Sequence, residues 1–329
     1  MVNKSIKIII NWFIGPLLAA WLFYSLYQQI KGQASLPAAW AIIKQAPFGP
    51  QAWKFWLVIV LAFVNWGIES RKWQLLMKLL QPMRFSTAVK SVLCGVTLSL
   101  NTPNRIGEYG GRVLFVEEGK RLQSVSLSIA GSISQLIITV IMGCLGLIYL
   151  LAQMNESSVI MGLSAFWIKV VLYLSCCAAA VLLLFFFKLG WLIRLIDKLP
   201  FADRFSKYIS VLEKFEAKLL LRLLFLSLLR YVVFVLQYIF MLQLTHVGVG
   251  WWQSVWIISV LFLVLAIVPS FAIADLGIRG KSGVELLKLY SGNIAGIIGT
   301  TFGIWFINLF VPAIIGSILI LGKKIIKEK

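Results

Sequence analysis

Histidine, cysteine and acidic residues are all scarce in this chain, and each scarcity excludes a kind of chemistry. The one histidine, His246, lies in a short loop between apolar stretches, which excludes a histidine-based triad and a metalloprotease pair. The four cysteines lie inside apolar stretches without the spacing of a zinc site. No Gly-x-x-x-x-Gly-Lys-[Ser/Thr] loop occurs, so ATP hydrolysis by that route is also excluded. We expect no metal, no cofactor and no catalytic residues, and therefore not an enzyme.

Charged residues are few, whereas apolar residues dominate. Only 13% of the 329 residues are charged and 60% are apolar, which lies far outside the range of soluble domains. This composition predicts an all-α polytopic membrane protein that forms a single integral membrane domain over 1–329. Six stretches are long enough, or nearly so, for the roughly 20 apolar residues of a crossing helix. They are 6–27, 53–68, 124–152, 159–187, 219–244 and 291–322.

The charges that are present are mostly positive, 31 basic against 12 acidic, and they are unevenly placed. Basic residues gather before the first apolar stretch, in 69–90, in 188–218 and in the tail, whereas the loops 153–158 and 245–250 have almost none. The positive-inside rule therefore places both termini in the cytoplasm of a multi-pass protein of the cell inner (plasma) membrane. Since 188–218 mixes apolar and basic residues, we expect it to be an amphipathic connector on the inner surface. Because the basic residues border spans and form no separate domain, we expect no nucleic-acid partner.

Two further apolar stretches, 86–101 and 251–268, are too short for a comfortable crossing. If both crossed, the segments after them would lie on sides that the charge pattern does not support. We therefore predict that each enters partway, breaks at a proline, Pro103 or Pro269, and returns. This gives about six full spans plus two re-entrant broken-helix hairpins.

The order of these segments repeats along the chain. A span, a broken hairpin and a second span make up 53–152, and the same order recurs in 219–322 with the opposite predicted orientation. Interrupted apolar segments at corresponding positions of two halves are typical of transporters with inverted repeats and a site near the midplane. We therefore interpret 53–152 as repeat 1 and 219–322 as repeat 2.

Three segments carry motifs that occur together in one family. They are Thr102-Pro103-Asn104-Arg105-Ile106-Gly107-Glu108 followed by Arg112, the earlier Glu69-Ser70-Arg71-Lys72-Trp73-Gln74-Leu75-Leu76, and the later Pro269 to Arg279. In these segments the chain resembles the lysylphosphatidylglycerol synthase transmembrane family. Its members are flippase-like membrane domains, found alone or joined to the aminoacyl-lipid synthase of the multiple peptide resistance factor. The resemblance covers nearly the whole chain and, since no room remains for a synthase domain, implies the membrane half only.

The later motif departs from the family pattern at one position. The family has Gly-x-Gly-x-Arg-Glu, and this chain has Asp275-Leu276-Gly277-Ile278-Arg279-Gly280, so Gly280 stands in place of a glutamate. Asp275 and Glu285 are the alternatives for that carboxylate.

The first hairpin has the chemistry of a phosphate site. Arg105 and Arg112 lie about two helical turns apart with Glu108 between them, so on a continuous helix the three would share one face. We predict that the two guanidinium groups hold a lipid phosphate and that Glu108 opposes or releases it. Pro103 would free backbone groups and place the positive end of the returning helix beside the same anion. The alternative is that this strip only locks the hairpin to its neighbours.

The second hairpin and the end of the second span add further positions. Asp275 and Arg279, at i and i+4, either complete the other gate or form a mutual ion pair. For Glu69 and Arg71 we expect interfacial anchoring, with headgroup contact as the alternative. The predicted headgroup site comprises Asn101, Pro103, Asn104, Arg105, Gly107, Glu108, Arg112, Pro269, Asp275, Gly277 and Arg279.

Together, these sequence features predict a lipid translocator. Its cargo would be an anionic or aminoacylated phospholipid or a polyprenyl phosphate. Two alternatives stay open. One is a membrane enzyme acting on a lipid phosphate, for which Glu108 is the acid or base. The other is a regulatory partner of a separate lipid synthase. A homo-oligomer is also compatible with the sequence.

Overall fold

The structure is a computed structural model. It describes residues 46–100, 102, 106–155, 159–188, 211–212, 215–268 and 272–321, without the side chains of 100, 272–276 and 321. The predicted first span 6–27 and most of the predicted connector 188–218 lie outside the described residues.

Within the described residues the fold is helical, and five helices are long and apolar enough to cross a membrane. They are α4 (Ala52–Met77), α7 (Arg121–Ala152), α8 (Ala165–Phe187), α11 (Ala217–Leu244) and a last rod built from α14 (Ile294–Trp305), the π-helical segment η5 (Phe306–Phe310) and α15 (Val311–Leu321). Five of the six predicted spans are therefore confirmed as long apolar helices, as expected of a polytopic membrane protein.

Two spans differ from the prediction at their ends. Helix α4 continues past residue 68 to Met77, because Glu69, Trp73 and Leu76 recur at helical spacing and are all buried. The predicted span 159–187 begins as a helix only at Ala165. The preceding residues form a small antiparallel hairpin, β1 (Val159–Ile160) and β2 (Leu163–Ser164), around the positive φ angles of Met161 and Gly162.

The two short apolar stretches form helices α5 (Phe85–Leu100) and α12 (Trp251–Ile267) of 16 and 17 residues. Each is followed by a break and a second helix, α6 (Gly107–Val113) or α13 (Ala272–Leu287). Val268, which precedes Pro269, is extended with φ −82° and ψ 113°, since proline disfavours helical backbone at the residue before it. A short 3-10 turn, η3 (Glu118–Lys120), links α6 to α7.

Glycine allows α5 and α6 to pack backbone against backbone. A Cβ atom at Gly111 would lie 2.3 Å from the carbonyl oxygen of Cys94, and one at Gly107 would lie 2.2 Å from that of Leu98. Across the break, the Thr102 hydroxyl donates to the Leu98 carbonyl at 3.1 Å and accepts from the Gly107 N–H at 2.7 Å. This contact fixes where α6 starts relative to α5.

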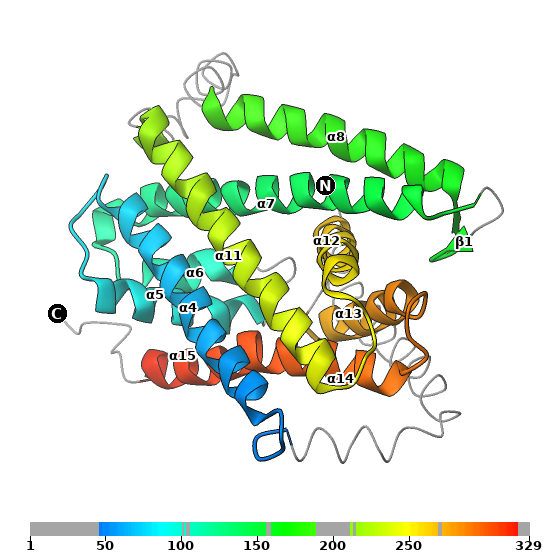
Figure 1. The fold of residues 1–329 in the computed structure, drawn as a ribbon. Helices are drawn as coiled ribbons and strands as arrows, with labels where there is room; N and C mark the ends of the chain where they lie inside the picture. The colour runs from blue at the N-terminus through cyan, green and yellow to red at the C-terminus, as the bar shows by residue number, and fades with distance from the viewer. Residues whose placement is uncertain are drawn as a thin grey trace, which may run out of the picture.

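Figure 1 shows α4 and α11 side by side, α7 and α8 side by side behind them, and α12 next to α7. Small residues bring the last pair together, because a Cβ at Gly143 of α7 would lie 2.6 Å from the Leu263 side chain of α12. Buried side chains of α7, α11 and α12 form the larger core. Helix α8 lies at the edge with most of its apolar side chains exposed, as expected for a lipid-facing helix.

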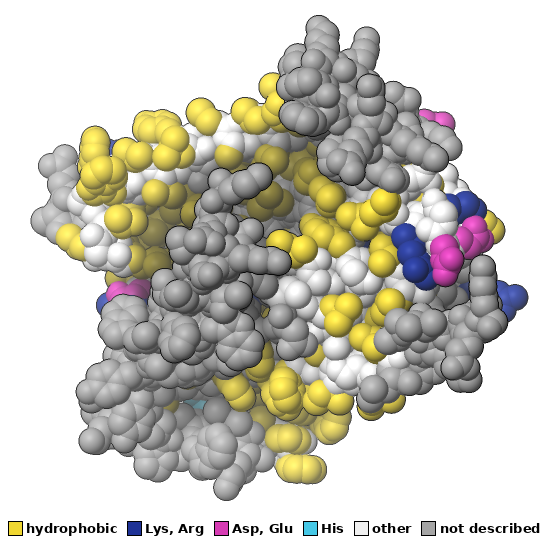
Figure 2. Space-filling view, turned by 180° about the vertical axis from the view of Figure 1, so that it is seen from behind, with side chains coloured by type: hydrophobic (Ala, Val, Ile, Leu, Met, Phe, Trp, Pro, Cys, Tyr) yellow, Lys and Arg dark blue, Asp and Glu magenta, His cyan; other side chains and the backbone are white. Residues whose placement is uncertain are grey.

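Apolar side chains cover much of the described surface, and charged ones gather at the margins (Figure 2). Exposed apolar residues include Phe63, Tyr173, Leu174, Phe225 and Ile318. Such a distribution is unfavourable in water and favourable against lipid.

Candidate functional site

Glu69 is the centre of a buried charge cluster built by three helices. It is only 4% exposed, and its carboxylate lies 3.1 Å from Lys72 Nζ, 3.1 Å from Arg230 Nη1 of α11 and 2.6 Å from Arg112 Nη2 of α6. Arg112 is also paired with Glu108, one turn away on α6. The cluster therefore connects the first half of the chain to the second.

The interfacial anchoring expected of Glu69 stays a prediction, and the structure shows its side chain buried in this cluster. Because α4 continues for two more turns, Glu69 lies inside the helix bundle, where its charge is compensated by side chains of other helices. Arg71 points the other way, is exposed and donates to Gln74.

Positive charge exceeds negative charge in this cluster. Three cations, Lys72, Arg112 and Arg230, share two carboxylates, Glu69 and Glu108. An uncompensated charge inside a low-dielectric interior is costly. The cluster is consequently attractive to an anion.

Arg112 does not occupy the position that the sequence analysis gave it. It is 2% exposed, holds both carboxylates, and its guanidinium lies 5.3 Å from the centre of the Trp73 ring. Its carbonyl accepts a 2.8 Å hydrogen bond from Ser91, which in turn accepts one from the Trp73 indole. Arg112 is therefore packed behind Glu108, and the prediction that it faces a headgroup is not supported by this geometry.

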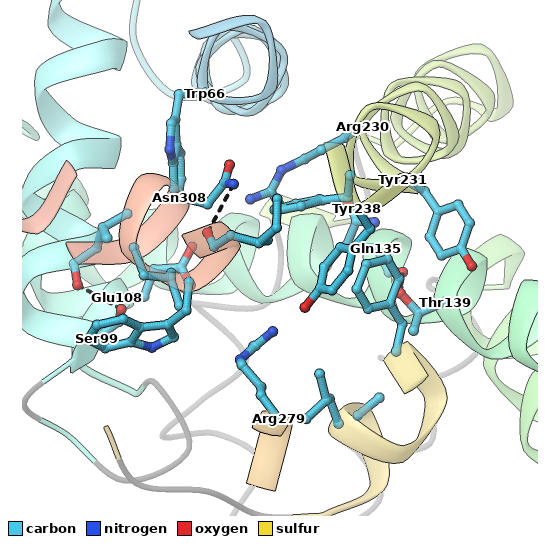
Figure 3. Close-up of a pocket in the computed structure, with 18 of the residues that line it drawn as sticks. Trp66, Ser99, Glu108, Gln135, Thr139, Arg230, Tyr231, Tyr238, Arg279 and Asn308 are labelled. Atoms are coloured by element: carbon cyan, nitrogen blue, oxygen red, sulfur yellow. Dashed lines mark hydrogen bonds between the residues drawn. The ribbon is translucent and has the colours of Figure 1, made fainter. Parts of the chain in front are cut away.

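A cavity of about 510 Å³ lies beside the cluster (Figure 3). Its wall includes Glu108 from α6, Arg279 from α13 and Arg230 from α11. Figure 3 shows the side chains of Arg230 and Arg279 entering from opposite sides. Two predicted site residues from different halves, Glu108 and Arg279, thus line one cavity.

A chain of amide contacts holds Arg230 in place. Its Nε donates to Asn65 Oδ1 at 2.7 Å, and Asn65 Nδ2 donates to Asn308 Oδ1 at 3.0 Å. Asn308 lies in the π-helical segment η5 and donates to the Ile304 carbonyl at 3.2 Å. A single π-helical turn inside an α-helix is frequently found at functional sites.

Three residues of the cavity wall, Trp66, Gln135 and Trp305, each carry a buried polar atom without a hydrogen-bond partner within the described part of the chain.

The remaining predicted site residues divide into two groups. Gly107 packs α6 on α5, and Gly277 is buried in α13. Asp275 lies in α13, but its side chain is outside the description. The others lie outside the described residues: Asn101, Pro103, Asn104, Arg105 and Pro269.

The sequence analysis missed three residues of this site, Arg230, Asn65 and Asn308. Arg230 had a signal, because it is a charge in the middle of the apolar helix α11, and intramembrane charges usually mark function. Asn65 and Asn308 are single polar residues in apolar spans, and nothing local indicates that they meet.

The chain matches no known protein-family profile. No curated protein is significantly similar to it. Among the described residues, no cluster of three or more His, Cys, Asp or Glu side chains could hold a metal ion. Functional inference therefore starts from the cavity and its charges.

Proposed function

We propose that this chain is a lipid translocator, which moves the headgroup of a phospholipid, an aminoacyl-phospholipid or a polyprenyl phosphate across the bilayer. The observation that carries the proposal is the cavity of about 510 Å³ among apolar helices, lined by Glu108 and Arg279 from the two broken hairpins and by Arg230. A charged headgroup needs such a polar route, because the hydrocarbon core alone offers it no partners.

In this mechanism the headgroup enters the cavity while its acyl or prenyl chains stay in lipid. Guanidinium groups bind phosphate oxygens with charge-assisted hydrogen bonds. Glu108, held by Arg112 at the cavity wall, opposes the bound anion and promotes its release. The energy source is either proton movement through a carboxylate or the lipid gradient itself.

The proposal includes the finer architecture. The two helix-break-helix segments, α5–α6 and α12–α13, are re-entrant hairpins of inverted repeats 53–152 and 219–322, with about six full spans and both termini in the cytoplasm of the plasma membrane. Their lengths of 16 and 17 residues for α5 and α12 support this, since both are short for a crossing. The resemblance to the lysylphosphatidylglycerol synthase transmembrane family belongs to the same proposal.

A membrane enzyme acting on a lipid phosphate is the second candidate, favoured by the carboxylate of Glu108 beside a basic cavity. The carboxylate of Glu108 is already engaged by Arg112, so it is not presented free to a substrate. Translocation therefore explains the geometry better. A regulatory partner of a separate lipid synthase would be recognised by co-purification.

Reconstitution separates these functions. The purified chain is placed in liposomes with labelled phospholipid or polyprenyl phosphate on one leaflet, and each leaflet is then analysed by mass spectrometry. The proposal predicts an unchanged lipid on the opposite leaflet. A chemically altered lipid would show an enzyme, and no movement of any tested lipid would overturn translocation.

A further inference from the structure

Arg230 is where the buried charge cluster meets the cavity. It shares Glu69 with Lys72 and Arg112, yet among these three cations it alone lines the cavity wall. Since Arg112 also pairs with Glu108, the three cations share two carboxylates, and Arg230 is not fully compensated. The positive charge of Arg230 that remains uncompensated therefore attracts an anion into the cavity.

The surroundings of Arg230 hold its guanidinium in one orientation. Nε donates to Asn65, Nη1 contacts Glu69, and the rings of Trp66 and Phe234 lie 5.4 and 5.3 Å from the guanidinium carbon. The other terminal nitrogen, Nη2, donates no hydrogen bond within the described part of the chain. A pre-oriented donor loses little entropy when it binds a ligand.

A second guanidinium completes this environment. Arg279 of α13 lines the same cavity, and its side chain enters from the side opposite Arg230 (Figure 3). Phosphate oxygens accept hydrogen bonds and carry negative charge, so they match this set.

The same geometry disfavours a cationic headgroup. An aromatic cage for an ammonium group needs open ring faces, but Arg230 already lies near the rings of Trp66 and Phe234. Glu108 is the one carboxylate that the described cavity wall contains, and its charge is already compensated by Arg112.

We propose that Arg230 is the principal phosphate ligand, assisted by Arg279, and that the cavity selects lipids whose headgroup carries a net negative charge. This inference rests on the proposed function and narrows its substrate to anionic phospholipids or polyprenyl phosphates, with aminoacylated headgroups disfavoured.

The test is binding to the full chain in detergent, measured by calorimetry. The probes are short-chain phosphatidylglycerol, its lysyl ester, short-chain phosphatidylcholine, farnesyl phosphate and inorganic phosphate. We expect phosphatidylglycerol or farnesyl phosphate to bind at least about 10-fold more tightly than phosphatidylcholine, and the lysyl ester to bind most weakly. Since a hydrogen bond to a charged group is worth about 10- to 100-fold in affinity, Arg230→Gln should lose about that factor.

The matched control is Arg222→Gln, an exposed arginine on the same helix, which should bind like wild type. If Arg230→Gln does not fold, the headgroup series on wild type still decides. Arg279→Gln then removes the second guanidinium of the cavity wall and should also weaken binding of the anionic probes. Equal affinity for phosphatidylglycerol and phosphatidylcholine would overturn the inference. So would inorganic phosphate binding as tightly as farnesyl phosphate, which would indicate a site for free anions.

The binding test and the liposome exchange test can fail independently of each other. Preference for anionic probes without leaflet exchange in liposomes would retain the anion site and overturn translocation. Exchange that ignores headgroup charge would retain translocation and overturn the anion site.

Discussion

At the scale of single residues, Glu69 is the junction between α4, α6 and α11. Its carboxylate contacts cations from each of these helices, and Lys72 also donates to Ser227 at 3.4 Å. Removing one member of a buried ion cluster leaves the others unpaired, which costs more than the cluster itself contributes.

Glu69→Gln should therefore be strongly destabilising. It would leave two buried cations, Lys72 and Arg112, and the half-buried Arg230 with Glu108 alone, and we expect a loss of about 3–5 kcal/mol. The measurement is thermal unfolding in detergent. The control is Glu118→Gln, an exposed carboxylate on η3, which should melt like wild type. Equal melting temperatures for both variants would show that the cluster does not stabilise the fold.

Asn65 and Asn308 offer a second test at this scale. Either alanine substitution leaves a buried amide group unpaired, at a cost of about 1–3 kcal/mol. Because the two amides bond to each other at 3.0 Å, the double substitution should cost less than the two single costs added together. A double-mutant cycle of unfolding free energies measures this. If the cost of the double substitution equals the sum of the two single costs, the contact between the two amides does not contribute to stability.

At the scale of elements, close helix packing depends on glycine. Gly111→Ala would place a methyl group 2.3 Å from a backbone oxygen of α5, so α6 must move away. We expect about 1–3 kcal/mol of destabilisation and a loss of transport, because Glu108 lies on the same short helix. Gly119→Ala, where nothing lies within 4 Å, is the matched control for stability and transport rate. A wild-type transport rate for Gly111→Ala would contradict the close packing of α6 on α5.

Apolar length and composition predict which segments are long helices, but not where those helices end. The residues after 68 are polar in sequence, yet they continue α4 because Trp73 and Leu76 are buried by tertiary packing. The end of α12 was predictable from local chemistry, because Val268 precedes a proline and is extended. The Asn65–Asn308 contact joins residues 243 positions apart, and local patterns contain no information about it.

At the scale of the whole molecule, the two halves of the chain meet at one cavity. Spacing on α6 predicted the Glu108–Arg112 pair, but only the three-dimensional arrangement shows that Glu108 shares a cavity wall with Arg279 and Arg230. The opposite orientation of the halves stays a prediction. A site between inverted halves is accessible from each side in turn.

Topology can be tested with single cysteines in a background that lacks the four native ones. Glu118→Cys, after the first hairpin, should react with an impermeant thiol reagent from the cytoplasmic side only. Lys288→Cys, after the second hairpin, should react from the outside only, and both native side chains are exposed enough to label. Labelling of both positions from one side would contradict re-entrant hairpins of opposite orientation.

The most direct test of the central claim is the rate of lipid exchange between leaflets of liposomes that contain only this chain. Wild type should move an anionic lipid faster than protein-free liposomes do, and Arg222→Gln should match it. Glu108→Gln and Arg279→Gln, which change one cavity residue on α6 and one on α13, should both reduce the rate to the protein-free value. Undiminished exchange in both variants would contradict a transport route through this cavity.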